Sequence, residues 1–381
     1  MDFGFTDDQE QLRRAAHEYF AAELPISFAR SMVEQPGDPG DERGFPREAW
    51  TRLCDLGWLG LAVPEDCGGS GLGLLELVLM LEEAGAVALP GPFVSTVSLS
   101  LPLLLAAAND DQRRALVPEA ATGKRRLAAG IAERRGRWNA EGIDAAASRD
   151  GASYVLDGSK LFVADAGDAD TLLVVARLGD GLGCFALPSD MPGVRVEAMR
   201  TIDGTRRLFT IELDRVRLEA PCLLGGGPLA PGTLEAVIDR AKVALAAGMV
   251  GAADRTLAMT VDYVGLREQF GRAIATFQAI QHRCADMKVA VEHARSLVYY
   301  AAWAVDTGAA DRRLAAAAAK AFASDACPAV AADSVQLHGG IGFTWEHDLH
   351  IYFKRLKADE QTYGDAIVQR ELVARLLEEA A

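Results

Sequence analysis

The chain has 381 residues, a formal net charge of −15 and 50% hydrophobic residues, enough for two or three structural units with a sizeable core. The acidic balance and the lack of a strong basic patch argue against a nucleic-acid-binding protein. The sequence contains no run of about eighteen uncharged apolar residues, so no membrane span is predicted. The acidic start, Met1 to Asp8, does not resemble a secretory signal, and the six scattered cysteines are typical of reduced thiols in the cytoplasm.

Residues 1–125 are predicted to form an N-terminal helical domain. The segment Asp7–Leu24 is amphipathic, and Thr6 with Gln9 three residues later has the pattern of a helix N-cap. Further helices, separated by Gly- and Pro-rich turns, are predicted over Ala49–Leu56, Leu72–Val87 and Asp110–Ala121.

Residues 126–225 have the texture of a β domain, and a small barrel or sandwich is predicted. The run Ser153–Val163 is interpreted as two short strands around a turn at Asp157-Gly158. Further strands, separated by Pro and Gly turns, are predicted over Thr171–Ala176, Gly183–Leu187, Val194–Ala198 and Arg207–Leu213.

Residues 226–381 return to a helical pattern. In one long helix, apolar residues recur at spacings of three and four and form one stripe, the pattern of a bundle core. The stripe consists of Ile280, Cys284, Met287, Val291, Ala294, Val298, Ala302 and Val305. A third helix is predicted over Leu314–Leu337, where Pro328 should kink it or shift its start.

A glycine cluster, Gly339-Gly340-Ile341-Gly342, follows that third helix. Glycine ends helices readily, because the end of a helix often requires positive φ. The same cluster leaves backbone N–H groups bare, so that an anion such as a pyrophosphate can approach closely. A plain helix end with a turn and an anion-binding loop are both consistent with this pattern.

Two stretches carry a resemblance to a known family. Arg267-x-Gln269-Phe270-Gly271-x-x-Ile274-x-x-Phe277-Gln278 and Gln336-Leu337-His338-Gly339-Gly340-x-Gly342-Phe343 closely resemble two signatures of the acyl-CoA dehydrogenases, at the expected spacing. The likeness extends over the whole chain. It implies an α+β fold of three domains: N-terminal helices (1–125), a middle β-barrel or sandwich (126–225) and a C-terminal four-helix bundle (226–381).

The resemblance also implies chemistry. The family removes a proton from the α carbon of an acyl-CoA thioester, while a hydride leaves the β carbon for FAD. The expected partners are therefore an acyl-CoA substrate and electron-transfer flavoprotein as electron acceptor. The family builds dimers and tetramers around the C-terminal bundle.

The usual catalytic carboxylate is missing from both family positions. Tyr363 stands at the position of the usual glutamate, and a phenol with a reference pKa of about 10 is a poor base. A minority of members place the glutamate where this chain has Ala241. Asp359 and Glu360, one helical turn before Tyr363, are weak candidates for a displaced base, since such acids are more often solvated surface groups.

The cofactor residues that the resemblance implies fall into two sets. Those that reach the ADP half of a neighbour's FAD are all present: Arg267, Gln269, Phe270, Gln278, Gln336, Gly339 and Gly340. Those that serve the chain's own flavin are altered: Ala132-Glu133-Arg134, Trp138-Asn139, Phe162-Val163-Ala164-Asp165 and Asp365. We therefore hypothesise a hetero-oligomer, similar to the α2β2 acyl-CoA dehydrogenases of bacterial steroid and lipid breakdown, in which a paralogous subunit carries the glutamate.

Two alternatives remain: a homotetrameric dehydrogenase with a displaced base, or a non-catalytic paralogous binding subunit without flavin. Asp239 and Lys242 match family positions near the CoA-binding end of a bundle helix, although a surface ion pair is equally consistent with them. His347-x-x-His350 is a weak metal pattern, and no metal is predicted.

Overall fold

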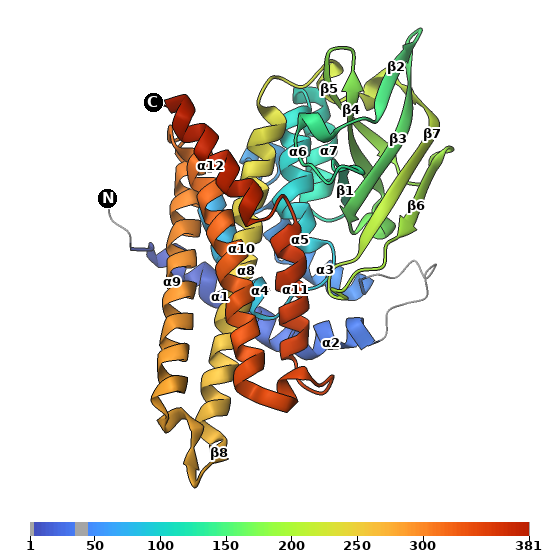
Figure 1. The fold of residues 1–381 in the computed structure, drawn as a ribbon. Helices are drawn as coiled ribbons and strands as arrows, with labels where there is room; N and C mark the ends of the chain where they lie inside the picture. The colour runs from blue at the N-terminus through green and yellow to red at the C-terminus, as the bar shows by residue number, and fades with distance from the viewer. Residues whose placement is uncertain (1–3, 35–44, 381) are drawn as a thin grey trace.

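The computed structural model describes residues 4–34 and 45–380. These form N-terminal helices, then a β-sheet, then a set of long helices. N-terminal helices and a β-sheet domain lie beside a long helical domain, as Figure 1 shows. Part of the Gly- and Pro-rich segment between the first two predicted helices, residues 35–44, lies outside the described residues. Among the residues described, no helix combines the length and apolar character needed to cross a bilayer.

The four predicted N-terminal helices, α1, α3, α4 and α7, begin and end within two residues of their predicted bounds, whereas α2, α5 and α6 were not predicted. Thr6 caps α1 through a reciprocal pair of hydrogen bonds with Gln9, at 3.3 Å and 3.0 Å, which confirms the predicted N-cap. A π-helical segment, η3, interrupts the helix that leads into α6. The bounds are α1 Asp7–Glu23, α2 Ile26–Glu34, α3 Arg47–Asp55, α4 Leu74–Ala86, α5 Phe93–Ser95, η3 Thr96–Ser100, α6 Leu101–Ala107 and α7 Asp110–Ala121.

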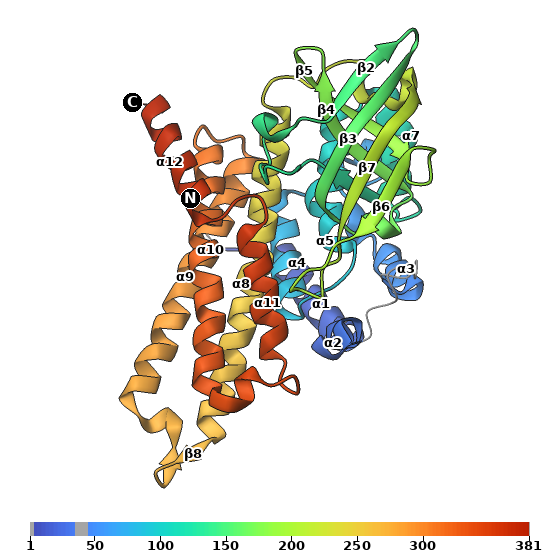
Figure 2. The ribbon, with the colours of Figure 1, turned by 45° about the vertical axis from the view of Figure 1, so that its right-hand side comes forward.

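The β domain is one curled seven-stranded sheet. Strand β4 pairs with β5 along one edge and with β1 and then β2 along the other, and the sheet continues through β3, β7 and β6. Figure 2 shows the long β3 and β7 side by side. The bounds are β1 Leu127–Gly130, β2 Ala146–Asp150, β3 Ser153–Ala164, β4 Thr171–Leu178, β5 Gly181–Pro188, β6 Val194–Ala198 and β7 Leu208–Glu219.

The predicted hairpin turn at Asp157-Gly158 is wrong, because β3 runs straight through it. Gly158 has φ of +136° and lies at a bulge against β7, and a Cβ there would come within 2.6 Å of the Ala145 side chain. Asp157 instead accepts a hydrogen bond from the Arg215 backbone N–H at 3.0 Å. The Asp-Gly pair thus bends a continuous strand rather than reversing the chain.

Three long helices, α8 (Thr233–Leu266), α9 (Gln278–Asp306) and α10 (Arg312–His338), form the helical domain with α11 (Leu349–Gln361) and α12 (Ala366–Ala380). The centre of the predicted α9 stripe, from Met287 to Ala302, is buried, whereas its ends are half-buried. Helix α10 continues through buried Pro328 and starts near its predicted position. The short β8 (Glu268–Gln269) and β9 (Arg272–Ala273) form a hairpin between α8 and α9.

Candidate functional site

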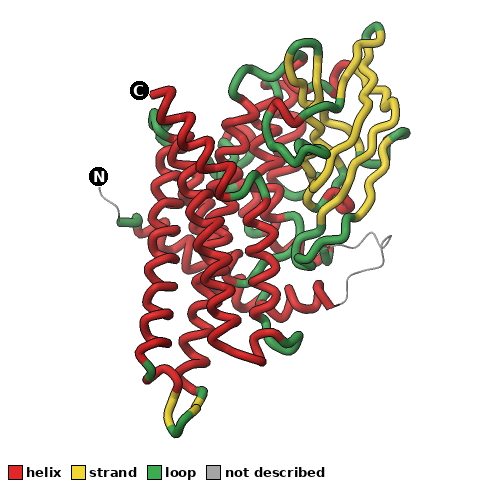
Figure 3. The backbone as a smooth tube through the Cα atoms, viewed as in Figure 1, coloured by secondary structure: helices red, strands yellow, loops and turns green. Residues whose placement is uncertain are grey.

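The residues predicted to hold a neighbour's cofactor lie together at one end of the helical domain, which we call the hairpin end: the β8–β9 hairpin, the first turn of α9, the last turn of α10 and η9 (Gly339–Phe343). Figures 1 and 3 show the hairpin at the tip of the bundle, away from the sheet. All of them are exposed: Arg267, Gln269, Phe270, Gln278, Gln336, Gly339 and Gly340. The chain itself therefore leaves this set free to contact another molecule.

The glycines of the hairpin end test whether a group from outside fits there. Gly339 has φ of +64°, a conformation that favours glycine for backbone reasons alone. Gly340 has no such backbone requirement, and a Cβ added to it would meet nothing within 4 Å. The chain's own packing therefore does not require glycine at position 340, whereas close approach of an external anion to the backbone would.

The predicted substrate residues and the residue at the glutamate position meet in a cavity of about 740 Å³, which we call the near cavity. It lies between α8, α12 and the loop that leads from β1 to β2. Trp138, Asn139, Asp239, Lys242 and Tyr363 all line it. Sequence positions as far apart as Trp138 and Tyr363 thus line one cavity.

Asp239 and Lys242 are buried rather than a surface pair. The Lys242 ammonium donates to Asp239 Oδ1 at 2.8 Å, and Arg313 from α10 donates to the other carboxylate oxygen at 3.3 Å. Two cations share the one carboxylate of Asp239, so this cluster carries one excess positive charge, whereas the lining of the near cavity as a whole has four basic and four acidic side chains. An anionic ligand would find a complementary charge there.

Tyr363 is buried and packs edge-on against Trp138, with ring centroids 4.8 Å apart. Burial raises the pKa of its phenol to about 12, which removes it as a base near neutral pH. Its backbone has φ of +62°, and the loop around it is held by Lys320. The Lys320 ammonium donates to the carbonyls of Glu360 at 3.0 Å and Gly364 at 3.2 Å, and burial lowers its pKa to about 8.

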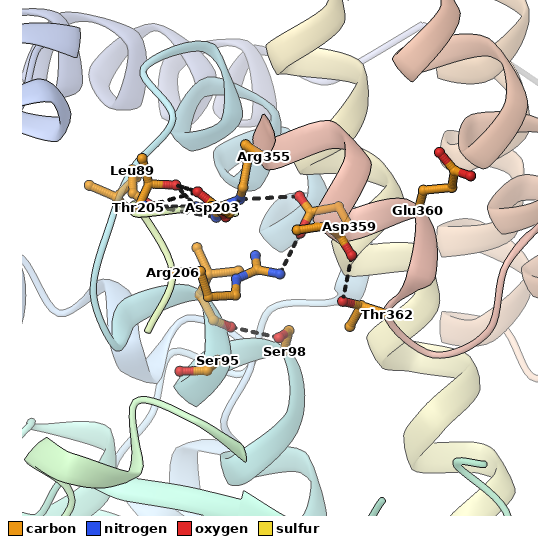
Figure 4. A network of polar contacts seen from close by, with 12 residues as sticks. Leu89, Ser95, Ser98, Asp203, Thr205, Arg206, Arg355, Asp359, Glu360 and Thr362 are labelled. Atoms are coloured by element: carbon orange, nitrogen blue, oxygen red, sulfur yellow. Dashed lines mark hydrogen bonds and ion pairs between the residues drawn. The ribbon is translucent and has the colours of Figure 1, made fainter. Parts of the chain in front are cut away.

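The weak candidate bases are both engaged in ion pairs. Asp359 is buried, with one oxygen 2.5 Å from an Arg206 nitrogen and the other 3.2 Å from Arg355 Nε, as Figure 4 shows. The cavity beside Asp359 holds about 20 Å³, room for at most one water molecule. Glu360 pairs with Lys357 at 2.5 Å and points away from Asp359 in Figure 4. Ala241 is buried and supplies no acid.

Three family models together match most of the chain. The N-terminal, middle and C-terminal domains of acyl-CoA dehydrogenase match residues 6–124, 128–216 and 233–378. The chain belongs to the acyl-CoA dehydrogenase family. Members are FAD-dependent oxidoreductases that act on CH–CH groups of acyl-CoA thioesters.

Similar proteins include subunits of larger complexes. The chain is 34% identical to acyl-CoA dehydrogenase IpdE2 of Mycobacterium tuberculosis, over 88% of this chain and 87% of that protein. It is 30% identical to a chain of the ChsE4–ChsE5 complex from the same species, covering 100% of this chain and 99% of that one, with a TM-score of 0.88. A chain from a variant of the Tcur3481–Tcur3483 steroid acyl-CoA dehydrogenase is 31% identical, with 98% coverage of both chains and a TM-score of 0.84.

The positions that face the chain's own flavin in other acyl-CoA dehydrogenases serve the structure of this chain. Glu133 accepts hydrogen bonds from the backbone N–H groups of Asp144 and Ala145, at 2.8 Å and 3.0 Å, and pairs with buried Lys160 at 2.5 Å. Asp165 is buried and accepts a hydrogen bond from Ser95 at 2.6 Å. Ala164 offers no hydroxyl where the family resemblance implies a threonine that meets the flavin, so this wall lacks one hydrogen-bond donor for a flavin of its own.

Asp365, which replaces a family threonine, has a local structural role. Its Oδ1 accepts hydrogen bonds from the backbone N–H groups of Ile367 and Val368, both at 3.0 Å. It therefore caps α12, where a carboxylate is favoured by the free N–H groups of the first turn. Its charge is consistent with this capping role and not with a nearby phosphate.

The histidine pattern supports no metal centre. Within the described part of the chain, no group of three or more His, Cys, Asp or Glu side chains is placed to hold a metal ion. His350 packs on Trp345 at 4.5 Å, and His347 packs against His338 at 4.7 Å. Both therefore serve packing at the hairpin end.

Three polar side chains that surround the Tyr363 loop, Arg206, Lys320 and Arg355, are not predicted from the sequence as part of this site. Arg206 pairs with an aspartate 153 positions away, and Arg355 donates to Thr205 at 2.7 Å from 150 positions away. Neither pairing leaves a local pattern. A lysine inside the apolar Ala-rich run of α10 was the one available signal for Lys320, since a lysine is rarely buried without a polar partner.

Proposed function

We propose that this chain is one subunit of a hetero-oligomeric, FAD-dependent acyl-CoA dehydrogenase, in which a paralogous partner supplies the catalytic carboxylate. The hairpin end would complete the partner's cofactor site by contacting the ADP half of its FAD. One observation carries the proposal: the intact cofactor set faces outward at the hairpin end, whereas the near cavity presents Tyr363 in place of a base.

The separation of the two regions supports this division. Arg267 lies 25 residues beyond Lys242 along α8, so about 37 Å of helix separates them at 1.5 Å per residue. Residues so far apart on one rigid helix serve different cofactor molecules more readily than one. The set at the hairpin end then needs a second chain to supply the rest of its site.

Exposed apolar side chains mark the hairpin end as a contact surface. Leu266 at the end of α8 is 84% exposed and Phe270 in the hairpin is 91% exposed. Phe343 at the end of η9 and Trp345 just after it are 73% and 60% exposed. Large apolar side chains gathered in this way are typical of protein–protein interfaces. A partner subunit of the same fold is the occupant that the family resemblance implies.

The partner's active site would then perform the reaction. Its carboxylate would remove the α proton while FAD, when bound, accepts the hydride. This chain's role there is to bind and orient the cofactor through backbone N–H groups and Arg267. Several expectations stay predictions. They are electron-transfer flavoprotein as electron acceptor, a cytoplasmic location, domain boundaries after residues 125 and 225, and a steroid or other lipid as the acyl group of the substrate.

The test is to produce this chain alone and together with a paralogue that carries the glutamate, and to count flavin per chain. We expect the lone chain to be colourless and inactive, and the complex to hold half a FAD per chain and turn over acyl-CoA. Stoichiometric FAD with dehydrogenase turnover by the lone chain would contradict the proposal. A complex with full activity but without any flavin contact from this chain would favour a plain binding subunit.

A homotetramer with a displaced base makes a different prediction. It requires one acid of this chain to be essential, and Asp359→Asn or Glu360→Gln would then abolish turnover by the lone protein. The proposal instead expects the complex with its paralogue to keep its turnover in Glu360→Gln, since Glu360 pairs with Lys357 and not with the cavity.

A further inference from the structure

A second large cavity lies on the opposite side of α8 from the near cavity, and we call it the N-domain cavity. Its volume is about 770 Å³, and it is partly open to solvent. It is lined by the loop before α4, by α4, η3, α6 and α7, and by the first turns of α8. Thr233, Ala236, Val237 and Arg240 line it from α8, whereas Glu235, Ile238, Asp239 and Lys242 of the same helix line the near cavity. Both sets repeat at three and four residues, so two separate faces of α8 are involved.

The wall of the N-domain cavity is mostly apolar. Side chains from four elements supply it, and they are buried or half-buried: Leu59, Val63, Leu77, Val97, Leu101 and Leu105. A cavity of this volume with apolar walls and a few polar groups is typical of a small-molecule site.

The charged groups around the cavity are unequal. Arg113, Arg114 and Arg240 face two acids, Asp66 and Asp110. Arg113 and Arg114 lie 3.6 Å and 3.7 Å from Asp110 and Asp111, as loose i,i+3 pairs at the helix surface. The lining therefore carries one excess positive charge in a chain of net charge −15.

Arg240 is the group best placed to bind an anion. Its side chain is only 21% exposed, and its nearest carboxylate, Asp306, lies 3.8 Å away. The Asp306 oxygens already accept hydrogen bonds from the backbone N–H groups of Leu74 and Leu75, at 2.7 Å and 2.9 Å. Burial lowers the pKa of the Arg240 guanidinium, and the Asp306 carboxylate opposes this shift.

We infer that the N-domain cavity binds an amphipathic monocarboxylate, with the apolar body against the leucines of α4 and α6 and the carboxylate on Arg240. A guanidinium matches a carboxylate through two parallel hydrogen bonds, which an apolar alcohol cannot reproduce. A straight fatty acid and a polycyclic acid share this chemistry. The site is separate from the acyl-CoA site of the proposed function, and the inference does not depend on the missing base.

The test is calorimetric titration of the full chain, in its complex where a partner is needed, with myristate and separately with cholate. We expect at least one to bind, and 1-tetradecanol to bind more weakly than myristate. Arg240→Gln should weaken the binding of the carboxylate ligand about ten-fold or more. Ala62→Phe, which extends a ring into the cavity, should abolish binding, and Arg283→Gln on α9, outside the cavity, is the matched control and should bind normally.

Several outcomes would overturn the inference. Binding of neither acid would do so, as would equal affinity of wild type, Arg240→Gln and Ala62→Phe. Competitive displacement by octanoyl-CoA would place the acid in the near cavity instead. Melting curves check that both variants are folded, and preference for myristate or for cholate tells a linear from a polycyclic ligand.

Discussion

At the hairpin end of the helical domain, glycines and large apolar side chains face outward, whereas in the buried network around Asp359 the charged groups are paired within the chain. Phe270 is 91% exposed, but Asp359 and Arg206 are largely buried against each other. The first region is open to contact from outside, and the second is held by ion pairs within the chain. The comparison supports the proposed function, in which this chain contributes to the cofactor site of a partner subunit.

The largest expected effect concerns the buried network of the closed region. Asp359→Asn leaves Arg206 and Arg355 with a neutral partner, and breaking a buried pair in this way costs about 3–5 kcal/mol. Urea unfolding of the lone chain measures the loss. Glu360→Gln is the control, because its half-exposed partner Lys357 limits the effect to below about 1 kcal/mol. A stable Asp359→Asn protein that has merely lost turnover would reverse the comparison and identify a base.

The next effect is a pH dependence at Asp165. Burial raises the pKa of this carboxyl to about 6 in the folded chain, from 3.8. A raised folded-state pKa contributes stability that is complete below pH 3.8 and is lost as the pH rises to about 6, at most about 3 kcal/mol. Asp165→Asn keeps an acceptor for Ser95 and removes the titration.

The free energy of unfolding of Asp165→Asn, relative to wild type, should therefore rise between pH 4 and pH 6. Unfolding curves at several pH values measure it. Ser95→Ala provides a check on the hydrogen bond alone, without removing the carboxyl. Parallel pH profiles for wild type and Asp165→Asn would show that Asp165 is not desolvated as the fold requires.

At the hairpin end, Arg267→Gln should weaken the binding of FAD to the complex about 10- to 100-fold. This is the effect of losing one charge-assisted contact to a phosphate. The stability of the lone chain should be unchanged, since Arg267 is exposed. Flavin release on dilution measures the first quantity and thermal melting the second. Arg272→Gln is a nearby control, because its guanidinium stacks on Phe277 at 4.1 Å. Equal flavin retention in both variants would count against a cofactor role for Arg267.

The smallest effect on the lone chain is expected for Gly340→Ala. A Cβ there meets nothing within 4 Å, so melting should shift little, while flavin in the complex should be lost if the backbone contacts a phosphate. Gly85→Ala is the contrasting variant, because its Cβ would lie 2.0 Å from the Gly248 carbonyl and force α4 away from α8. A complex that tolerates Gly340→Ala without loss of flavin would remove one support of the proposed division.

Local sequence patterns predicted much of the fold. Thr6 with Gln9 predicted a real N-cap, and the repeat from Met287 to Ala302 predicted a buried helix face. The Asp157-Gly158 pair misled, because a bulge and a turn use the same residues and only the pairing with β7 separates them. Only part of the candidate site could be predicted. The two motifs identified the residues that lie at the hairpin end, but no spacing indicated that Arg206 would pair with Asp359, 153 positions away.

Leu266 and Phe270 are among the most solvent-exposed apolar side chains of the described chain, and this has a consequence for the cell. A polypeptide that presents such a tip before its partner arrives invites self-association and chaperone capture. Matched synthesis of the two subunits would shorten that interval. We therefore expect the yield of intact protein to depend on co-translation with the paralogue, through folding quality control as much as through chemistry.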